Sequence, residues 1–389
     1  MAMTNPFKPG NGVEPAYLAG RREQIQEFTK SLKAFEEGLP RNAVLYGLRG
    51  TGKTVLLRHY KILAETSGWL FIEREFNERY CSENEFADIF GKDLAAAASE
   101  ASIRKRILET GKKLFSAVKP EELGAYGITY KPFYQDRREV LEDYIGKILE
   151  ANWPIFEKAG KKGVVFLYDE FHLVRDRKDE RQYVLSSLLT AIAKVQREGL
   201  RYYLCLSGLP LLKTNLKAAK TYAERMFIFQ EIENLEPKEA EKALTEPLKK
   251  EGYEFTEGLT RKIIEETAGY PYFLQFYGYF LIEHARTNRV TGKDFETQRP
   301  ELLKALDKSF FDDRYRLASE AEKTILQAMA ESGKKEAPAS QLAKKTRMND
   351  QMLQQYLARL TDKGLVFRPQ RGHYAFSIPL FKEYLLRRK

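Results

Sequence analysis

The chain has 389 residues, of which 43% are hydrophobic and 31% charged, and its formal net charge at pH 7 is +10. This length predicts two or three domains, and this hydrophobic content is ample for real cores. No run approaches the roughly 18 apolar residues that a membrane-spanning helix needs, and the first residues lack the charged and then apolar pattern of a signal peptide. The sequence therefore predicts a globular, soluble, cytoplasmic protein with no membrane partner.

A phosphate-binding loop is the most informative motif of the chain. An arm rich in proline and glycine, and a helix from about residue 18 to 38, precede it. The apolar run 43–46 predicts a strand and residues 53–64 predict a helix, and the pattern G-x-x-x-x-G-K-[ST] lies between them, which is the context that the motif requires. Its residues are Gly47, Leu48, Arg49, Gly50, Thr51, Gly52, Lys53 and Thr54.

The residue types of this loop point to a nucleotide. Three glycines let the backbone come within hydrogen-bonding reach of phosphate oxygens, and the helix that follows presents free N–H groups and its positive dipole end. We expect Lys53 to neutralise the β and γ phosphates of ATP and the Thr54 hydroxyl to ligate Mg²⁺.

The second predicted strand covers residues 69–72, and a long insertion follows it. Residues 77–160 predict mostly helix, with a basic cluster at 104–106 and aromatic residues at 126, 130, 133 and 134. A solvated helical face over a local core explains these features. A role in gripping a partner is the alternative, and the sequence leaves it open.

Two acidic residues follow a buried strand. The continuous apolar run 164–168 predicts a central strand of a parallel sheet that is buried on both faces. Asp169 and Glu170 come directly after it, at the carboxyl edge where open α/β sheets bind ligands. We expect Asp169 to hold Mg²⁺ through water and Glu170 to orient and polarise the attacking water.

Two further candidates lie near the ends of later strands. Ser207 ends the strand predicted at 201–207, where it would contact the γ-phosphate or the attacking water, or else bond the turn that follows. Arg225 precedes the strand predicted at 226–229. It would reach the γ-phosphate of a neighbouring subunit as an arginine finger, or else pair with Glu224 or the rim of the sheet.

The layout resembles that of the AAA+ ATPases, in the branch of the Orc/Cdc6-type proteins and the archaeal-type STAND ATPases. The residues that carry the resemblance are Gly20 and Arg21, the phosphate-binding loop, the run 166–171, Ser207 and Arg225. The resemblance implies an α/β fold, a P-loop NTPase with a five-stranded parallel sheet, a helical lid and a C-terminal winged helix. It also implies that Gly20 and Arg21 lie against the base and ribose.

The expected lid consists of three helices, over residues 237–250, 256–268 and 272–284. Gly269, Tyr270 and Pro271 resemble the G-x-P motif of STAND proteins, which closes over the nucleotide. The chain departs from Orc/Cdc6-type proteins because no second-sensor arginine begins the third helix, and because Ser207 stands where an asparagine is commoner. These departures favour a slow switch over fast autonomous hydrolysis.

The last part of the chain resembles a winged-helix domain. Helices are predicted at 320–330, 340–346 and 350–363, followed by a hairpin of residues 365–367 and 373–376. Residues 338–389 hold eleven Lys or Arg against three Asp or Glu, which favours a polyanionic partner. We expect the helix at 350–363 to read duplex DNA, and the expected DNA contacts are Arg347, Gln354, Arg368 and Arg371.

The expected domains are therefore a nucleotide-binding domain at 1–234, a lid at 235–316 and a winged helix at 317–389. Their expected function is an ATP-driven switch that binds DNA and assembles with itself or with a partner ATPase subunit. The alternative is a STAND-type sensor whose winged helix binds protein. A P-loop kinase for small molecules fits less well, because the Asp169 and Glu170 pair and the lid suit water activation.

Cysteine and histidine are scarce. Cys81 and Cys205 are far apart, and Cys205 lies inside an apolar run where a buried, inert thiol is expected. The four histidines, at 59, 172, 284 and 373, lack the spacing of metal ligands. We expect neither a zinc site nor a structural disulfide.

Overall fold

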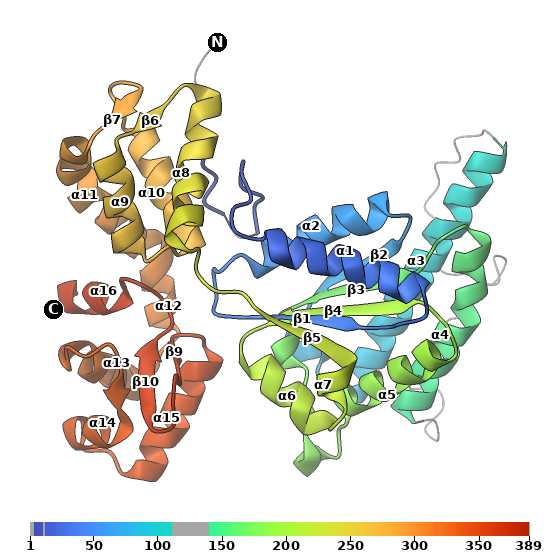
Figure 1. Cartoon of the computed structure of the whole chain (residues 1–389). Coiled ribbons are helices and arrows are strands. Elements are labelled where there is room, and N and C mark those ends of the chain that lie inside the picture. Colours follow the sequence, from blue (N-terminus) through green and yellow to red (C-terminus); the bar gives the residue numbers. More distant parts are fainter. Residues whose placement is uncertain (1–3, 11, 111–139, 389) are drawn as a thin grey trace. The chain divides into compact units, whose positions relative to one another are not determined.

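A computed structural model describes residues 4–10, 12–110 and 140–388, without the side chains of residues 103–110 (Figure 1). The basic cluster at 104–106 and the aromatic residues at 126, 130, 133 and 134 therefore lie outside the described side chains. The chain divides into two compact units. The sheet unit comprises Arg22–Gly47 and Lys53–Ile232, and the helical unit comprises Met1–Arg21, Leu48–Gly52 and Glu233–Lys389.

This division groups together segments that the sequence analysis expected in different domains. The N-terminal arm, the tip of the phosphate-binding loop, the expected lid and the expected winged helix all belong to the helical unit. Phe7 of the arm is buried, and a Cβ at Gly278 would lie 2.7 Å from its ring. The arm is therefore part of the core of the helical unit.

The sheet unit is built on five parallel strands in the order β2-β3-β4-β1-β5 (Figure 1). The strands are β1 (Asn42–Tyr46), β2 (Leu70–Glu75), β3 (Val164–Asp169), β4 (Tyr202–Gly208) and β5 (Phe227–Glu231). Every residue of β1, β3 and β4 is buried, as expected for strands that are covered on both faces. The expected α/β fold class with a five-stranded parallel sheet is confirmed.

Helices cover both faces of this sheet. They are α1 (Arg22–Glu36), α2 (Lys53–Thr66), α3 (Glu83–Thr110), α4 (Leu141–Lys158), α5 (Val184–Arg197), α6 (Leu211–Ala219) and α7 (Ala223–Met226), with short 3-10 turns η1 (Glu78–Tyr80), η4 (Phe171–Leu173) and η5 (Lys178–Glu180). One core packs α1 and α2 against the sheet, and a larger one packs α3, α4, α5 and α6 against the opposite face.

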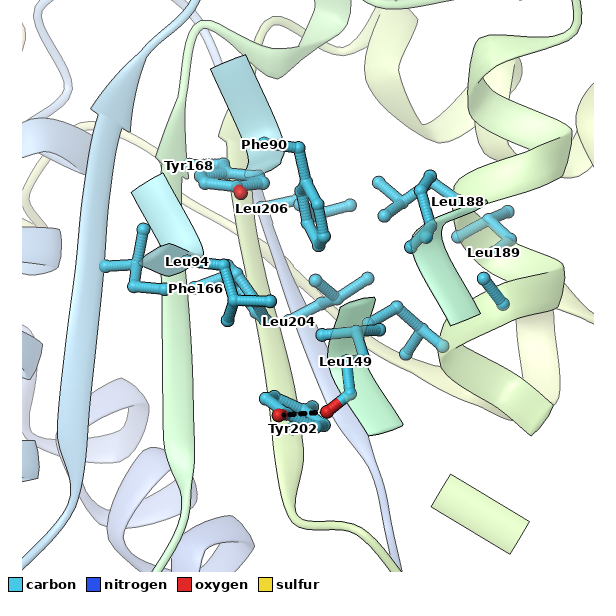
Figure 2. Packing of buried hydrophobic residues seen from close by; sticks show 14 of the residues in the cluster. Phe90, Leu94, Leu149, Phe166, Tyr168, Leu188, Leu189, Tyr202, Leu204 and Leu206 are labelled. Carbon is cyan, nitrogen blue, oxygen red and sulfur yellow. Dashed lines mark hydrogen bonds between the residues drawn. The ribbon is translucent and has the colours of Figure 1, made fainter. Parts of the chain in front are cut away.

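The described part of the insertion belongs to the larger of these cores. Phe90 and Leu94 of α3 and Leu149 of α4 pack on Phe166 and Leu204 of the sheet (Figure 2). The Tyr202 hydroxyl donates a 2.7 Å hydrogen bond to the Leu149 carbonyl in the same core. The insertion therefore covers one face of the main sheet, which is more than the local core expected from its sequence.

The first helix begins four residues later than its sequence pattern predicts. Gly20 has a φ of +62°, which an L side chain rarely adopts, and its N–H donates to Glu239 at 2.8 Å. A Cβ at Gly20 would also lie 2.9 Å from the Leu235 side chain. The turn at Gly20 therefore delays the start of α1 to Arg22.

Among its described residues, the helical unit contains ten elements of helix and two small sheets. The helices are α8 (Pro237–Glu251), α9 (Glu257–Thr267), α10 (Pro271–Glu283), α11 (Gly292–Leu306), the π-helix η6 (Asp307–Phe311), α12 (Asp312–Arg316), α13 (Glu320–Glu331), α14 (Ala339–Thr346), α15 (Asp350–Asp362) and α16 (Phe381–Arg387). One sheet pairs β6 (Glu254–Phe255) with β7 (Arg289–Val290), and the other orders β8 (Ala337–Pro338), β10 (His373–Phe376) and β9 (Val366–Phe367) as β8-β10-β9.

Candidate active site

A polar network lies at the carboxyl edge of the parallel sheet, around Asp169. This last residue of β3 is 7% exposed. Its Oδ2 accepts a 2.5 Å hydrogen bond from the Thr54 hydroxyl at the start of α2, and its Oδ1 accepts a 2.8 Å bond from the Ser207 hydroxyl on β4. The neighbouring parallel strands β3 and β4 end at this edge, so the fold brings together three predicted site residues. The Ser207 hydroxyl is engaged by Asp169 and not by the turn that follows it.

Lys53 is held at the base of the phosphate-binding loop. It is 6% exposed, and its Nζ donates a 3.0 Å hydrogen bond to the Gly47 carbonyl. A Cβ at Gly47 would lie 2.2 Å from the Ile232 carbonyl oxygen, so only glycine fits there. Gly50 and Gly52 have φ values of +76° and +93°, which also favour glycine. A buried ammonium group in a loop that glycines shape is suited to receive an anion.

Tyr270 contacts the tip of this loop within the helical unit. Its hydroxyl donates a 2.7 Å hydrogen bond to the Arg49 carbonyl, and a Cβ at Gly50 would lie 2.0 Å from the same hydroxyl oxygen. Pro271 is the first residue of α10, where its fixed φ suits a helix start. Tyr270 therefore packs closely against the tip of the loop. Nucleotide contacts of Tyr270 and Pro271 remain a prediction.

Arg21 also contacts the loop tip. It is 7% exposed, and its guanidinium donates to the Thr51 carbonyl at 2.9 Å and to the Glu233 carbonyl at 2.7 Å. Burial lowers the pKa of Arg21. These bonds tie the loop to the segment that leads into α8. Contact of Gly20 and Arg21 with a base or ribose remains a prediction.

Glu170 follows the network in an unusual backbone conformation. Its φ is +51°, in the left-handed region, and its side chain is 22% exposed. Its Oε2 lies 3.7 Å from Nε2 of His172, which is 3% exposed. From the sequence, this histidine was expected not to be a metal ligand, and no other role was predicted for it. Its position two residues after the predicted catalytic Glu170 is the sequence signal that could have pointed to it.

Arg225 lies on the surface of the sheet unit. It is exposed on the short helix α7. Glu224 forms an ion pair with Lys217, and the hydrogen bond from Lys217 lowers the pKa of Glu224. Within the part of the chain that the structure describes, the Arg225 guanidinium forms no hydrogen bond or ion pair. The pair with Glu224 that the sequence offered as one alternative is therefore not formed.

The four predicted DNA contacts are exposed on the last part of the helical unit. Arg347 ends α14 with a φ of +56°, and Arg368 and Arg371 lie in the connection between β9 and β10. Gln354 lies on α15, where its Oε1 accepts a 3.1 Å hydrogen bond from the Tyr374 hydroxyl. Their exposure leaves them accessible to a partner, while a winged helix and its DNA contacts remain predictions.

Part of the basic charge in this region is used within the chain. Four of its basic residues pair with acidic residues that precede residue 338. The charge count of residues 338–389 does not include these acidic residues. The pairs are Lys345 with Glu331, Lys363 with Glu322, Arg387 with Asp307 and Arg388 with Asp312. The charge excess of the sequence therefore overstates what is available to a partner.

The oxygen atoms at the carboxyl edge fit the magnesium site that the fold implies. The Thr54 hydroxyl and the Asp169 carboxylate are already in contact, and hydroxyl and carboxylate oxygens are the ligands that Mg²⁺ takes in nucleotide sites. Among the described residues, no three His, Cys, Asp or Glu residues form a group that could hold a metal by themselves.

In the part of the chain that the structure describes, no helix is long and apolar enough to cross a membrane. Cys81 and Cys205 are buried free thiols, and burial raises the pKa of both.

Two separate parts of the chain match known protein families. Residues 17–205 match the family described as AAA ATPase domain, which implies nucleotide binding and hydrolysis. Residues 308–385 match a domain of unknown function, DUF8462. No curated protein matches the sequence significantly.

The chain is similar to several solved structures. A Walker-type ATPase of Pyrococcus abyssi has a TM-score of 0.61 and 18% identity, over 95% of this chain and 96% of that one. The Aeropyrum pernix ORC1 protein, solved in complex with DNA, has a TM-score of 0.46 and 15% identity, over 96% and 94% of the chains. The Thermotoga maritima RuvB Holliday junction branch migration motor has a TM-score of 0.45 and 15% identity, over 95% of each. The first similarity establishes a shared P-loop NTPase fold, and TM-scores below 0.5 support no inference about function.

Proposed function

We propose that the protein is a Mg²⁺-dependent ATPase that acts as a slow molecular switch. The observation that carries this proposal is the contact of Thr54 and Ser207 with Asp169 at the carboxyl edge of the sheet. It joins the end of the phosphate-binding loop to the acidic pair at the end of β3. The AAA ATPase match of residues 17–205 supports the same activity.

Each residue of this edge has a role in hydrolysis. Lys53 neutralises phosphate oxygens, and Thr54 and Asp169 would hold Mg²⁺, which supplies charge stabilisation to the phosphates when bound. Glu170 orients the attacking water, whose oxygen bonds to the γ-phosphorus as the bond to ADP breaks. Ser207 holds the Asp169 carboxylate in place. The absence of a second-sensor arginine at the start of α10 favours slow turnover.

We propose further that ATP promotes assembly with a second copy or a partner ATPase subunit. Arg225 supports this, because it is exposed and unpaired within the described chain. An arginine in that situation can stabilise the transition-state charge at a neighbouring site.

Duplex DNA is the partner that we propose for the C-terminal segment. The exposed Arg347, Arg368 and Arg371 support it, because exposed guanidinium groups suit phosphate contacts. Gln354 adds an amide on α15 that suits a base edge. The switch would then couple the nucleotide state to DNA binding.

A STAND-type sensor that binds protein is the second candidate. Two observations favour it. Four basic residues of the segment are committed to ion pairs inside the chain. The exposed positions of α15 are mostly uncharged: Gln351, Met352, Gln354, Gln355 and Ala358. A surface of this kind suits a protein partner as well as a nucleic acid.

Two substitutions test the ATPase proposal. Lys53→Ala removes the positive charge that neutralises the phosphates and should weaken ATP binding. Glu170→Gln should keep ATP binding and lose turnover by about 10²- to 10⁴-fold. Glu224→Gln, on the exposed surface of the sheet unit, is the matched control. Binding is measured with a fluorescent ATP analogue and turnover by phosphate release. Turnover of Glu170→Gln at the wild-type rate would exclude the role given to Glu170.

A further inference from the structure

His172 and Glu170 form a close pair that the chemistry of a phosphate-binding loop does not require. Glu170 begins the turn η4 with its φ of +51°, and the Leu173 N–H donates to the Glu170 carbonyl at 3.1 Å. This tight turn folds His172 back toward the Glu170 side chain, so that Nε2 lies 3.7 Å from Oε2. A left-handed conformation at a non-glycine residue costs free energy, and such residues cluster at functional sites.

His172 is also in contact with β4 and α6. A Cβ at Gly208 would lie 3.1 Å from His172 Nδ1 and 3.0 Å from the His172 backbone nitrogen, so a larger residue there would press His172 to move by a few tenths of an ångström. Asn215 of α6 donates a 3.0 Å hydrogen bond to the His172 carbonyl. The ring is 3% exposed and has little room to turn away. Its place beside Glu170 is therefore set by packing.

We propose that His172 is the positioning residue for Glu170: its Nε2–H holds one carboxylate oxygen, so that the other faces the attacking water. This proposal rests on the proposed ATPase function. The 3.7 Å separation is longer than a hydrogen bond, and hydrogen bonds at catalytic sites often tighten when the substrate binds. Loss of this contact should widen the range of positions of the Glu170 carboxylate, so that it meets the water less often.

Substitution of His172 separates positioning from folding. His172→Ala should lower the turnover number roughly ten- to hundredfold, because misplacing a catalytic group has effects of that size, while the affinity for ATP stays within about twofold. His172→Gln keeps a donor and should recover most of the activity. His284→Gln, at an exposed histidine of the helical unit, should have no effect. Thermal unfolding of each variant reports whether it is folded.

A double-mutant cycle tests whether His172 acts through Glu170. In the Glu170→Gln background, His172→Ala should cause no further loss of turnover, because the group that it positions is already gone. An equal loss in both backgrounds would overturn the proposal and assign His172 to the general integrity of the site.

A measurement that needs no activity completes the test. In protein labelled with ¹⁵N at histidine, the His172 signals are identified by their loss in His172→Gln. Glu170→Gln should shift those signals, whereas Glu224→Gln should not. Unchanged His172 signals in Glu170→Gln would overturn the pairing even if the protein hydrolyses ATP. Shifted signals in a protein without ATPase activity would instead place the failure in the proposed function.

Discussion

The carboxyl edge of the sheet and the C-terminal segment are both rich in charge, but they use it differently. At the sheet edge, Lys53 and Asp169 are 6% and 7% exposed, and each has a partner inside the site. In the C-terminal segment, Arg368 and Arg371 are exposed, while Lys363 pairs with an acid of the same unit. A buried charge requires a partner, so its surroundings reveal its role. An exposed charge has no such requirement, and its partner must be found by experiment.

Among the candidate site residues of the sheet unit, Arg225 is the one that is exposed, and within this comparison it gives the largest expected effect. If it acts across a subunit boundary, Arg225→Ala should bind ATP normally and hydrolyse it about 10³-fold more slowly. Mixing it with Lys53→Ala protein should restore part of the activity, since an intact site then meets an intact arginine. Lys217→Ala is the control on the neighbouring helix. The absence of rescue at every ratio, together with a monomer in ATP by light scattering, would exclude the role across subunits.

Removing the charge of Asp169 tests the buried half of the comparison. Asp169→Asn should lower turnover roughly 10²-fold or more and weaken the dependence on Mg²⁺, because the site then lacks a carboxylate ligand. Ser207→Ala removes only a hydroxyl that holds Asp169 and should have a smaller effect. Turnover is measured by phosphate release over a Mg²⁺ titration. A larger loss in Ser207→Ala than in Asp169→Asn would reverse the assigned roles.

Exposed and paired arginines of the C-terminal segment should differ in DNA binding. Arg368→Ala with Arg371→Ala should weaken binding to all duplex sequences alike and lower the salt slope by about two, one for each guanidinium group removed from a phosphate. Arg387→Ala, which removes a residue paired with Asp307, should change the slope less. Fluorescence anisotropy at several salt concentrations gives both slopes. Equal slopes for the two variants would contradict the distinction between free and committed charge.

The smallest expected effects are on stability. Lys363→Ala leaves the 1% exposed Glu322 without its ion pair and should cost about 1–3 kcal/mol. Lys345→Ala breaks a pair with Glu331 that is partly open to solvent and should cost less than about 1 kcal/mol. Chemical denaturation measures both. A greater loss in Lys345→Ala would show that burial does not set the value of these pairs.

The sequence predicted the sheet and most of the helices because their signals are local. Continuous apolar runs predict β1, β3 and β4, and the phosphate-binding loop lies between a strand and a helix as its motif requires. The helix predicted from about residue 18 began at Arg22 instead. The turn at Gly20 depends on Leu235 and Glu239, more than 200 residues away, and no local pattern reports that contact.

The candidate site was predicted unevenly for the same reason. The residue types of Lys53, Thr54 and Asp169 follow from motifs, but the bond from Ser207 to Asp169 depends on how two parallel strands align. The approach of His172 to Glu170 depends on a left-handed residue and a tight turn. The ion pairs of the C-terminal segment join residues that are far apart in the sequence, so a count of charges does not predict them.

Binding of the full-length protein to duplex DNA, compared with ATP, with ADP and without nucleotide, tests the central claim most directly. Glu170→Gln holds the ATP state during the measurement. We expect the tightest binding with ATP, and with about four to six phosphate contacts the affinity should fall by roughly two to three decades between 50 and 200 mM salt. The absence of duplex affinity at 50 mM salt in all three states would contradict the claim and favour a sensor that binds protein.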